Sequence, residues 1–220
     1  RMSSLWLGLP ILALLVRQQG LPLAIPRAHW GRVALLALTN MVLWHVLMIL
    51  AIPLLSSGRA AILGYTMPIF SAVIGALLFG DRLARRGWAG VGAALLGVVL
   101  LLWHEMGALG SRPMGVTLML VSAASWALGT QLLRRLHVPV PLITLSFWMV
   151  AITCACLTVL AALFEHERWH MPDRQAWAAI LYNGLLVLGF AQTAWFFLVR
   201  TLPPVASTLS VMMIPVLGVF

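Results

Sequence analysis

Long apolar runs separated by short polar segments fill almost all of the 220-residue chain. Each run has about 15 to 24 residues, close to the roughly 20 that an α-helix needs to cross the hydrocarbon core of a bilayer. Gly, Pro and Arg gather in the short segments between the runs. The pattern predicts an all-α fold, a polytopic bundle of membrane helices. Eight helices are expected, over residues 2–16, 33–55, 60–79, 88–103, 114–133, 141–164, 176–199 and 203–220.

Composition supports this fold class and excludes an ordinary soluble domain. Hydrophobic residues make up 62% of the chain and charged residues only 9%, against about 25% charged in globular proteins. The protein would therefore need lipid to solvate much of its apolar surface. The net charge of +9 comes entirely from arginines, which stand singly or in twos and threes between the apolar runs. That distribution favours membrane topology signals, and we expect the lipid bilayer as a partner and no nucleic acid.

The arginines predict an orientation in the membrane. Cytoplasmic loops of membrane proteins carry an excess of Lys and Arg. The first, third, fifth and seventh loops along the chain carry nine arginines in total, and the loops between them carry four. We therefore expect the first set to face the cytoplasm and the protein to be a multi-pass protein of the inner (plasma) membrane. The nine are Arg17, Arg27, Arg32, Arg82, Arg85, Arg86, Arg134, Arg135 and Arg200.

A proline interrupts the third run and has a counterpart in the last. Pro68 stands near the middle of "AAILGYTMPIFSAVIGALLFGDR", and a shift of 147 residues places it on Pro215. The second and third runs fall on the seventh and eighth under the same shift. Paired interrupted helices in two inverted halves indicate the central binding site of a transporter. The alternative is two unrelated prolines, which membrane helices tolerate fairly often.

This spacing suits two inverted repeats of five helices, of which about eight of ten helices are present. We expect the first repeat over residues 1–107 and the second over 108–220. The chain opens on Arg1 and stops inside an apolar run at Phe220. We therefore interpret it as the central part of a longer protein that has one further helix at each end.

The stretch "AAILGYTMPIFSAVIGALLFGDRLARRGWAGVGAALLGVVLLL" resembles the fourth and fifth helices of an EamA-type permease of the drug/metabolite transporter superfamily. "GVTLMLVSAASWALGTQLLRR" is similar to the helix that opens the second repeat, and "ASTLSVMMIPVLGVF" resembles its Pro-bearing fourth helix. The family's usual Glu is Asp81 here, a shorter carboxylate that can still cap the helix or pair with Arg82 or Arg85. The resemblance implies movement of small metabolites by alternating access, often efflux of amino acids, amines or similar compounds.

Candidate solute-binding residues come from the polar and aromatic positions of the apolar runs. His45 lies near the middle of the second run, and an ionisable residue at that depth is a functional candidate. It could equally be a neutral histidine that bonds across a helix interface. The 147-residue shift places it on Gln192, and each lies 23 residues before its proline, Pro68 or Pro215. We expect His45 and Gln192 to line a central cavity.

The backbone next to a membrane proline predicts further members of this site. Carbonyls one turn before a proline lose their intrahelical donor, and such backbone is tolerated only against protein or a wet cavity. Tyr65 lies three residues before Pro68 and Met67 lies one residue before it, so we expect both to face inward. The resemblance to aromatic amino-acid exporters also implies pocket positions for these two residues and for Trp126. We expect the two prolines, Pro68 and Pro215, to act as hinges.

Other function classes find little support in the sequence. An intramembrane enzyme would need a buried nucleophile or a metal cluster, and no HExxH or GxSxG motif occurs. A scaffold subunit without transport activity would have no need for matched prolines with polar partners. We therefore expect a transporter of small-molecule substrates with no catalytic residues, no metal site and no cofactor. It would act as a monomer or a homodimer.

Overall fold

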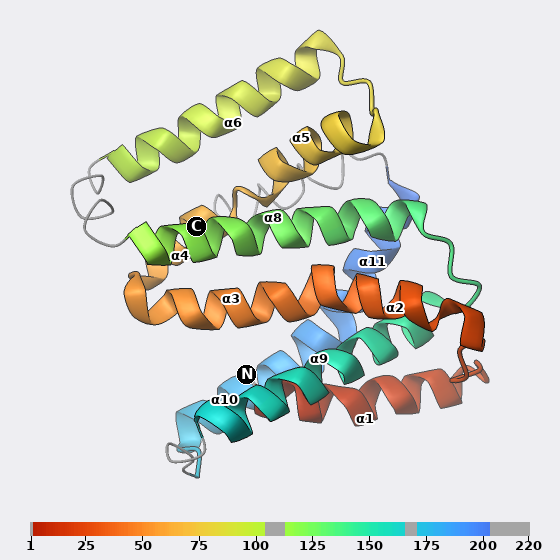
Figure 1. Ribbon diagram of the computed structural model, residues 1–220. Helices are drawn as coiled ribbons and strands as arrows, with labels where there is room; N and C mark the ends of the chain where they lie inside the picture. Colours follow the sequence, from red (N-terminus) through yellow and green to blue (C-terminus); the bar gives the residue numbers. More distant parts are fainter. Residues whose placement is uncertain (1, 104–112, 166–170, 203–220) are drawn as a thin grey trace. The chain divides into compact units, whose positions relative to one another are not determined.

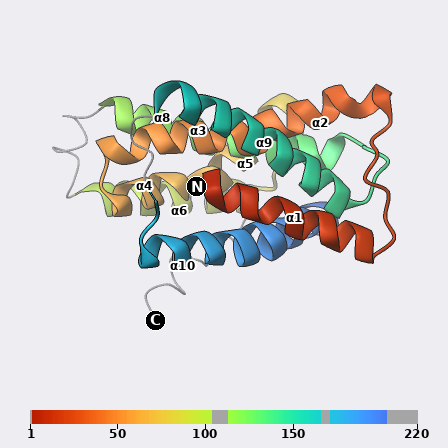
Figure 2. The same ribbon diagram turned by 90° about the horizontal axis from the view of Figure 1, so that it is seen from below.

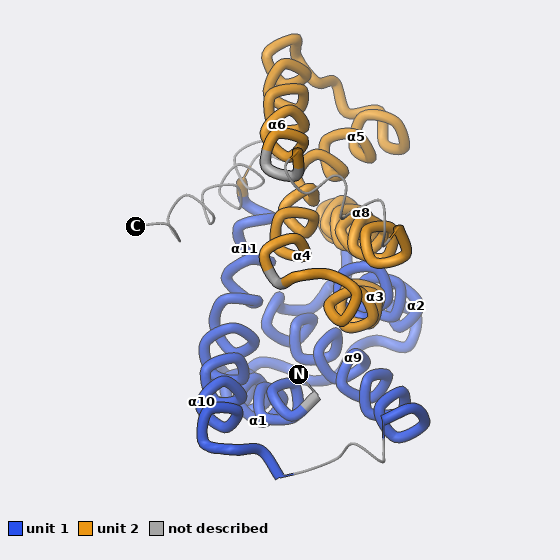
Figure 3. Tube along the Cα trace, turned by 90° about the vertical axis from the view of Figure 1, so that its left-hand side faces the viewer, with its two compact units in different colours: residues 1–42, 136–201 blue, residues 43–135, 202–220 orange. Residues whose placement is uncertain are grey.

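A computed structural model describes residues 2–103, 113–165 and 171–202 (Figure 1). The chain divides into two compact units (Figure 3). Unit 1 contains Arg1–Val42 and Leu136–Thr201, and unit 2 contains Leu43–Arg135 and Leu202–Phe220. Each unit combines segments of both predicted repeats. This spatial division therefore does not test the predicted boundary at residue 107, which stays a prediction.

Unit 1 packs α1 against helices from the second half of the chain. Its elements are α1 (Met2–Gln18), the 3-10 turn η1 (Arg27–His29), α2 (Trp30–Ala37), the π-helix η2 (Leu38–Val42), α9 (Leu142–Phe164), α10 (Arg174–Tyr182), the π-helix η5 (Asn183–Ala191) and α11 (Gln192–Thr201). Figure 2 shows α1 alongside α10, and α1 also contacts α9 and η5. The contact with η5 is close: a Cβ added to Gly184 would lie only 2.8 Å from Leu7 Cδ2.

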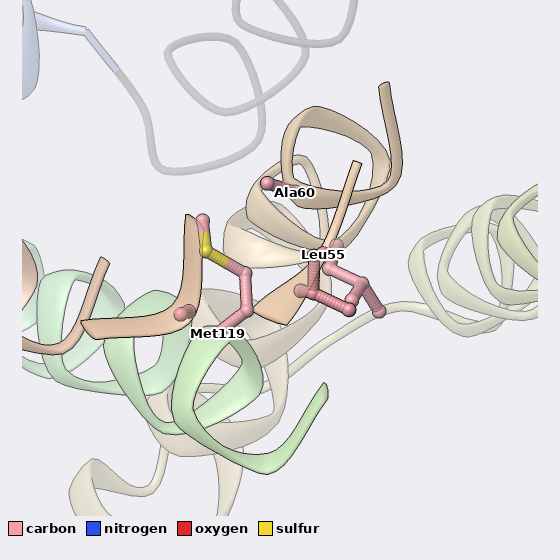
Figure 4. Close-up of a cluster of buried hydrophobic side chains, with 5 residues drawn as sticks. Leu55, Ala60 and Met119 are labelled. Carbon is pink, nitrogen blue, oxygen red and sulfur yellow. The ribbon is translucent and has the colours of Figure 1, made fainter. Parts of the chain in front are cut away.

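Unit 2 is organised around α8. Its elements are α3 (Leu43–Ala51), the 3-10 turn η3 (Ile52–Leu54), α4 (Ser57–Gly64), α5 (Met67–Phe79), α6 (Arg85–Trp103) and α8 (Pro113–Arg135). Helix α8 contacts α3, α4 and α5, and α6 contacts α4 and α5. A buried cluster joins α3, α4 and α8 through Leu55, Ala60 and Met119, together with Ala51 and Leu63 (Figure 4).

The predicted fold class is confirmed. All seven predicted apolar runs that fall on described residues are helical, and the eighth, 203–220, lies outside them. Within the described part of the chain, five helices are long and apolar enough to cross a membrane: Arg27–Leu54, Gly58–Phe79, Pro113–Arg135, Leu142–Phe164 and Arg174–Thr201. Large apolar side chains stand exposed on these helices, among them Leu77 (75%) and Phe190 (71%). Such surfaces suit contact with lipid.

Three arginines donate hydrogen bonds that join segment 134–137 to loops that the arginine count places on the same side of the membrane. Arg32 Nη1 donates to the carbonyl of His137 (2.8 Å), Arg134 Nη1 donates to that of Leu202 (3.2 Å), and Arg135 Nη2 donates to the carboxylate of Asp81 (2.7 Å). The first bond joins two predicted cytoplasmic loops within unit 1, and the bonds of Arg134 and Arg135 join predicted cytoplasmic loops within unit 2. The orientation of these loops in the membrane stays a prediction.

Candidate functional site

The third predicted helix is broken directly before its proline. Helix α4 ends at Gly64, a two-residue turn covers Tyr65 and Thr66, and α5 begins at Met67. Pro68 is buried in the first turn of α5, where a residue without a backbone N–H is tolerated. The interruption lies inside the Gly58–Phe79 span. The sequence therefore located the break correctly, while the hinge function of Pro68 stays a proposal.

Local hydrogen bonds satisfy part of the backbone around this break. The hydroxyl of Thr66 is buried and donates to the carbonyl of Leu63 at 2.6 Å. The carbonyl of Thr66 in turn accepts from the Phe70 N–H at 3.1 Å. A polar group without a partner is costly in a membrane, and these bonds remove that cost. The Tyr65–Thr66 turn is thus an ordered, hydrogen-bonded interruption of the span and not a frayed helix end.

An aromatic pair lies between α3 and α8 in unit 2. The rings of Trp44 and Trp126 meet edge to face, with centroids 5.1 Å apart and planes at 67°, an arrangement that aromatic rings favour. The hydroxyl of Ser122, one turn before Trp126, donates to the carbonyl of Trp44 at 2.9 Å. This bond fixes α3 against α8 next to the pair. Trp44 directly precedes His45 and was not singled out from the sequence.

The pair lies next to the interrupted helix. A Cβ on Gly64 would lie 3.5 Å from Trp44 Cη2 and 3.1 Å from Met119 Cε. The last residue of α4 therefore lies close against α3 and α8, where an added Cβ would crowd the end of the Met119 side chain. Tyr65 follows Gly64 directly in the chain. In unit 2 the structure thus brings the break in the third span close to the Trp44–Trp126 pair.

The predicted solute-binding residues are distributed over both units. His45 on α3, Tyr65 in the turn, Met67 on α5 and Trp126 on α8 are all half-buried in unit 2. Gln192 belongs to unit 1, where it is the first residue of α11 and is buried, with 8% of its surface exposed. Pro215 lies outside the described residues. The assignment of these five residues to one solute site stays a proposal.

The two spans that the 147-residue shift relates, Arg27–Leu54 and Arg174–Thr201, each contain a π-helix, and the two π-helices lie at equivalent positions. Segment η2 covers Leu38–Val42 in the first copy, and η5 covers Asn183–Ala191 in the second. The 147-residue shift places η2 inside η5, and His45 and Gln192 follow these segments closely. Single π-turns in α-helices occur frequently at functional sites. The hydrophobic periodicity of the sequence gave no signal for them, since one extra residue per turn changes a short apolar pattern very little.

Polar side chains join the end of α5 to α8. Arg135 Nη2 donates to both carboxylate oxygens of Asp81 at 2.7 Å, and the guanidinium carbon lies 4.2 Å from the ring centroid of Phe79. Gln131 Nε2 donates to the carbonyl of Ser71 at 2.7 Å and to its hydroxyl at 3.0 Å. Arg135 also donates to the backbone carbonyl and the side-chain oxygen of Gln131. We call these side chains, of Ser71, Phe79, Asp81, Gln131 and Arg135, the α5–α8 network.

The partner of Asp81 differs from the sequence expectation. From the sequence, Asp81 can cap the helix or pair with Arg82 or Arg85, which follow it closely along the chain. In the structure Gly80 takes the left-handed conformation (φ 69°) and the Asp81 N–H donates to the carbonyl of Gly75. This turn ends α5 and brings the carboxylate to Arg135 on α8. The sequence-based expectation for the ion pair was wrong because it considered only neighbours along the chain.

Potential metal ligands do not cluster in the part of the chain that the structure describes. There, His, Cys, Asp and Glu side chains form no group of three or more that could hold an ion. The residues predicted for the solute site carry aromatic rings, an imidazole, a thioether and an amide instead. Such groups can stack on a solute or form hydrogen bonds with it.

A bundle of long apolar helices, with two halves related by a sequence repeat and a span broken next to an aromatic pair, is typical of multi-pass membrane transporters. The chain belongs to the EamA-like transporter family, whose model matches residues 2–103 and again residues 113–220. The family expected from the sequence is therefore confirmed.

Relatives with curated names are transporters. The uncharacterized transporter YoaV of Bacillus subtilis (strain 168) is 24% identical over 98% of this chain and 74% of its own length. The uncharacterized inner membrane transporter YedA of Escherichia coli (strain K12) is 27% identical over 74% of this chain and 52% of its own length. The aromatic amino acid exporter YddG of Ancylobacter novellus is 28% identical over 69% of this chain and 53% of its own length. The chain thus matches about half of the length of YedA and YddG.

A solved structure, named only as "Crystal structure of protein", has a similar fold. It superposes on this chain with a TM-score of 0.74 at 22% sequence identity. The match covers 95% of this chain and 72% of the other. This similarity concerns the fold alone.

Proposed function

We propose that the protein moves small metabolites across the inner (plasma) membrane by alternating access, in the direction of efflux. Amino acids, amines or similar compounds are the proposed substrates. Membership of a transporter family supports the transport activity, the name of YedA supports the membrane, and that of YddG supports an exported amino acid. The two repeats, residues 1–107 and 108–220, would move so that one central site opens first to one face of the membrane and then to the other.

One observation carries this proposal: a membrane span is interrupted at Tyr65–Thr66, next to an edge-to-face pair of tryptophans. A broken span supplies backbone that can change conformation at modest cost, and the aromatic faces can stack on a flat or cationic solute. We propose that the solute site is lined by Tyr65, Met67 and Trp126, with His45 and Gln192 as polar members.

Pro68 and Pro215 are the proposed hinges of the two repeats. Hinge residues lie at the ends of helices, where a few backbone angles absorb the movement. Pro68 fits this description, because it occupies the first turn of α5 directly after the Tyr65–Thr66 turn. The repeat relation supports the same function for Pro215, 147 residues further along.

Solute flux through the purified protein tests the activity. The protein is reconstituted in proteoliposomes, and the exit of preloaded radiolabelled amino acids and amines is measured beside protein-free liposomes. Saturable exit of at least one solute, competed by its unlabelled form, is the expected result. If every solute leaves at the rate of protein-free liposomes, the proposed transport of amino acids and amines is wrong.

A further inference from the structure

The buried side of α11 concentrates polar atoms that have no hydrogen-bond partner. Seven buried side-chain N or O atoms in the described part of the chain lack a partner, and four of them belong to this ten-residue helix. They are Gln192 Nε2, Thr193 Oγ1, Trp195 Nε1 and Arg200 Nη2. Buried polar groups in proteins are nearly always bonded, and an unpaired one costs more in a membrane than in water. This concentration therefore indicates a ligand.

These four side chains share one side of the helix. At 3.6 residues per turn they fall within an arc of about 160°. Phe196 and Val199, which are almost completely buried, lie within the same arc, while Phe197 and Leu198 on the other side are exposed. The unpaired atoms thus belong to the side of α11 that turns away from lipid.

All four atoms are hydrogen-bond donors. An amide nitrogen, a hydroxyl, an indole nitrogen and a guanidinium nitrogen can each present an N–H or O–H to a ligand, and the guanidinium adds a positive charge. The complementary ligand is rich in acceptors and negatively charged, as a carboxylate is. Charge-assisted bonds from such donors are about twice as strong as neutral ones.

The carboxylates of unit 1 that the structure describes do not supply this partner. The acidic residues that the structure describes there are Glu165 and Asp173. Asp173 caps α10 by accepting from the Ala176 N–H at 2.7 Å. Arg200 stands 27 residues after Asp173 in one helical span, about 40 Å away at 1.5 Å per residue. Glu165 follows the end of α9 and precedes the same span.

We propose that the donor-bearing side of α11 is a carboxylate-binding subsite, so that the protein's substrates carry a carboxylate. This inference rests on the proposed transport function and narrows it to acids, amino acids included, over simple amines. Arg200 binds the charge, and Gln192, Thr193 and Trp195 donate to the carboxylate oxygens or to other acceptors of the same solute. The side chain of Gln192, already proposed for the solute site, gains a defined function as a donor.

Binding of a simple carboxylate tests this subsite without any transport. The thermal stability of the purified protein in detergent is measured with increasing benzoate and with benzamide, at constant ionic strength. A ligand that binds only the folded state raises the melting temperature. We expect stabilisation by benzoate and none by benzamide. Equal effects of the two compounds, or no effect of benzoate, would overturn the subsite.

Variants locate the effect on α11. Arg200→Gln should weaken benzoate binding at least 10-fold, whereas Arg174→Gln, which removes an equal charge from an exposed position, should leave it unchanged. Thr193→Val and Trp195→Phe should each weaken it roughly 3- to 10-fold. Because Thr193→Val removes a buried hydroxyl that lacks a partner, it should not destabilise the ligand-free protein. Equal losses in Arg174→Gln and Arg200→Gln would contradict the proposal.

Flux measurements separate the two proposals. If benzoate binds through Arg200 and proteoliposomes transport no solute, the subsite stands and the transport function fails. If amines and amino acids are transported equally well and Arg200→Gln changes neither, transport stands and the carboxylate subsite is wrong.

Discussion

Arg135 on α8 donates two hydrogen bonds of 2.7 Å to the carboxylate of Asp81, which lies just after the end of α5. The two residues are 54 positions apart in the sequence, and their side chains are 28% and 37% exposed. The pair links the end of the interrupted span to the helix that carries Trp126. It belongs to the α5–α8 network, in which the same guanidinium lies over Phe79 and bonds to Gln131.

Loss of this pair should weaken unit 2 modestly. A partly exposed ion pair contributes about 1 kcal/mol at most, so Asp81→Asn should lower the free energy of unfolding by about that amount. Arg135→Gln should cost about 2 kcal/mol, because it also removes the contacts with Phe79 and Gln131. Unfolding by denaturant in detergent measures both. Arg86→Gln, at an exposed position, is the control, and a loss there equal to that of Arg135→Gln would contradict this account.

The α5–α8 network has no room for a side chain at Gly75. A Cβ there would lie 2.6 Å from Asp81 Oδ2 and 2.9 Å from Gln131 Nε2. We expect Gly75→Ala to destabilise the protein by about 1–3 kcal/mol, the usual cost of overpacking. At Gly90 on α6 nothing lies within 4 Å of a Cβ among the described residues, so Gly90→Ala should be neutral or slightly stabilising. Equal unfolding free energies of the two variants would show that the network tolerates displacement.

Cysteine labelling tests the predicted orientation. The loop around Ala84 belongs to the arginine-rich set, and Met171, 85% exposed, belongs to the other. In intact cells, a membrane-impermeant thiol reagent should label Met171→Cys and leave Ala84→Cys unlabelled until the cells are opened. The unsubstituted protein is the control, because any labelling of it comes from the native Cys154 and Cys156. The reverse labelling pattern would invert the topology.

Much of the fold could be predicted from the sequence because a bilayer permits few alternatives. Apolar runs of sufficient length must form helices there, and Pro68 ends α4 by its own geometry. Contacts across the bundle could not be predicted in this way. The partner of Asp81 is on α8, and Trp44 became notable only through its ring contact with Trp126. The unpaired donors of α11 were also invisible, since a sequence does not show which polar atoms find partners.

Pro68→Ala should alter the rate of transport more than the affinity for solute. Alanine restores an N–H that can continue the helix across the Tyr65–Thr66 turn, which would stiffen the proposed hinge. We expect the maximal rate to fall several-fold while KM changes by less than about two-fold, because the proposed function of Pro68 is to absorb the backbone movement and not to contact the solute. Flux at varied solute concentration gives both quantities. A rise in KM with an unchanged maximal rate would instead place Pro68 among the solute contacts.

Solute affinity of the aromatic variants tests the central claim most directly. Loss of a stacking or hydrogen-bonding contact costs about 1–2 kcal/mol, or roughly 5- to 30-fold in affinity. In proteoliposomes that contain equal amounts of folded protein, Trp126→Ala and Tyr65→Ala should therefore raise the KM of the transported solute by that factor. Trp88→Ala, at an exposed position on α6, should leave KM unchanged. If Trp126→Ala and Tyr65→Ala both transport with the KM of the parent protein, the solute site is not next to the interrupted helix.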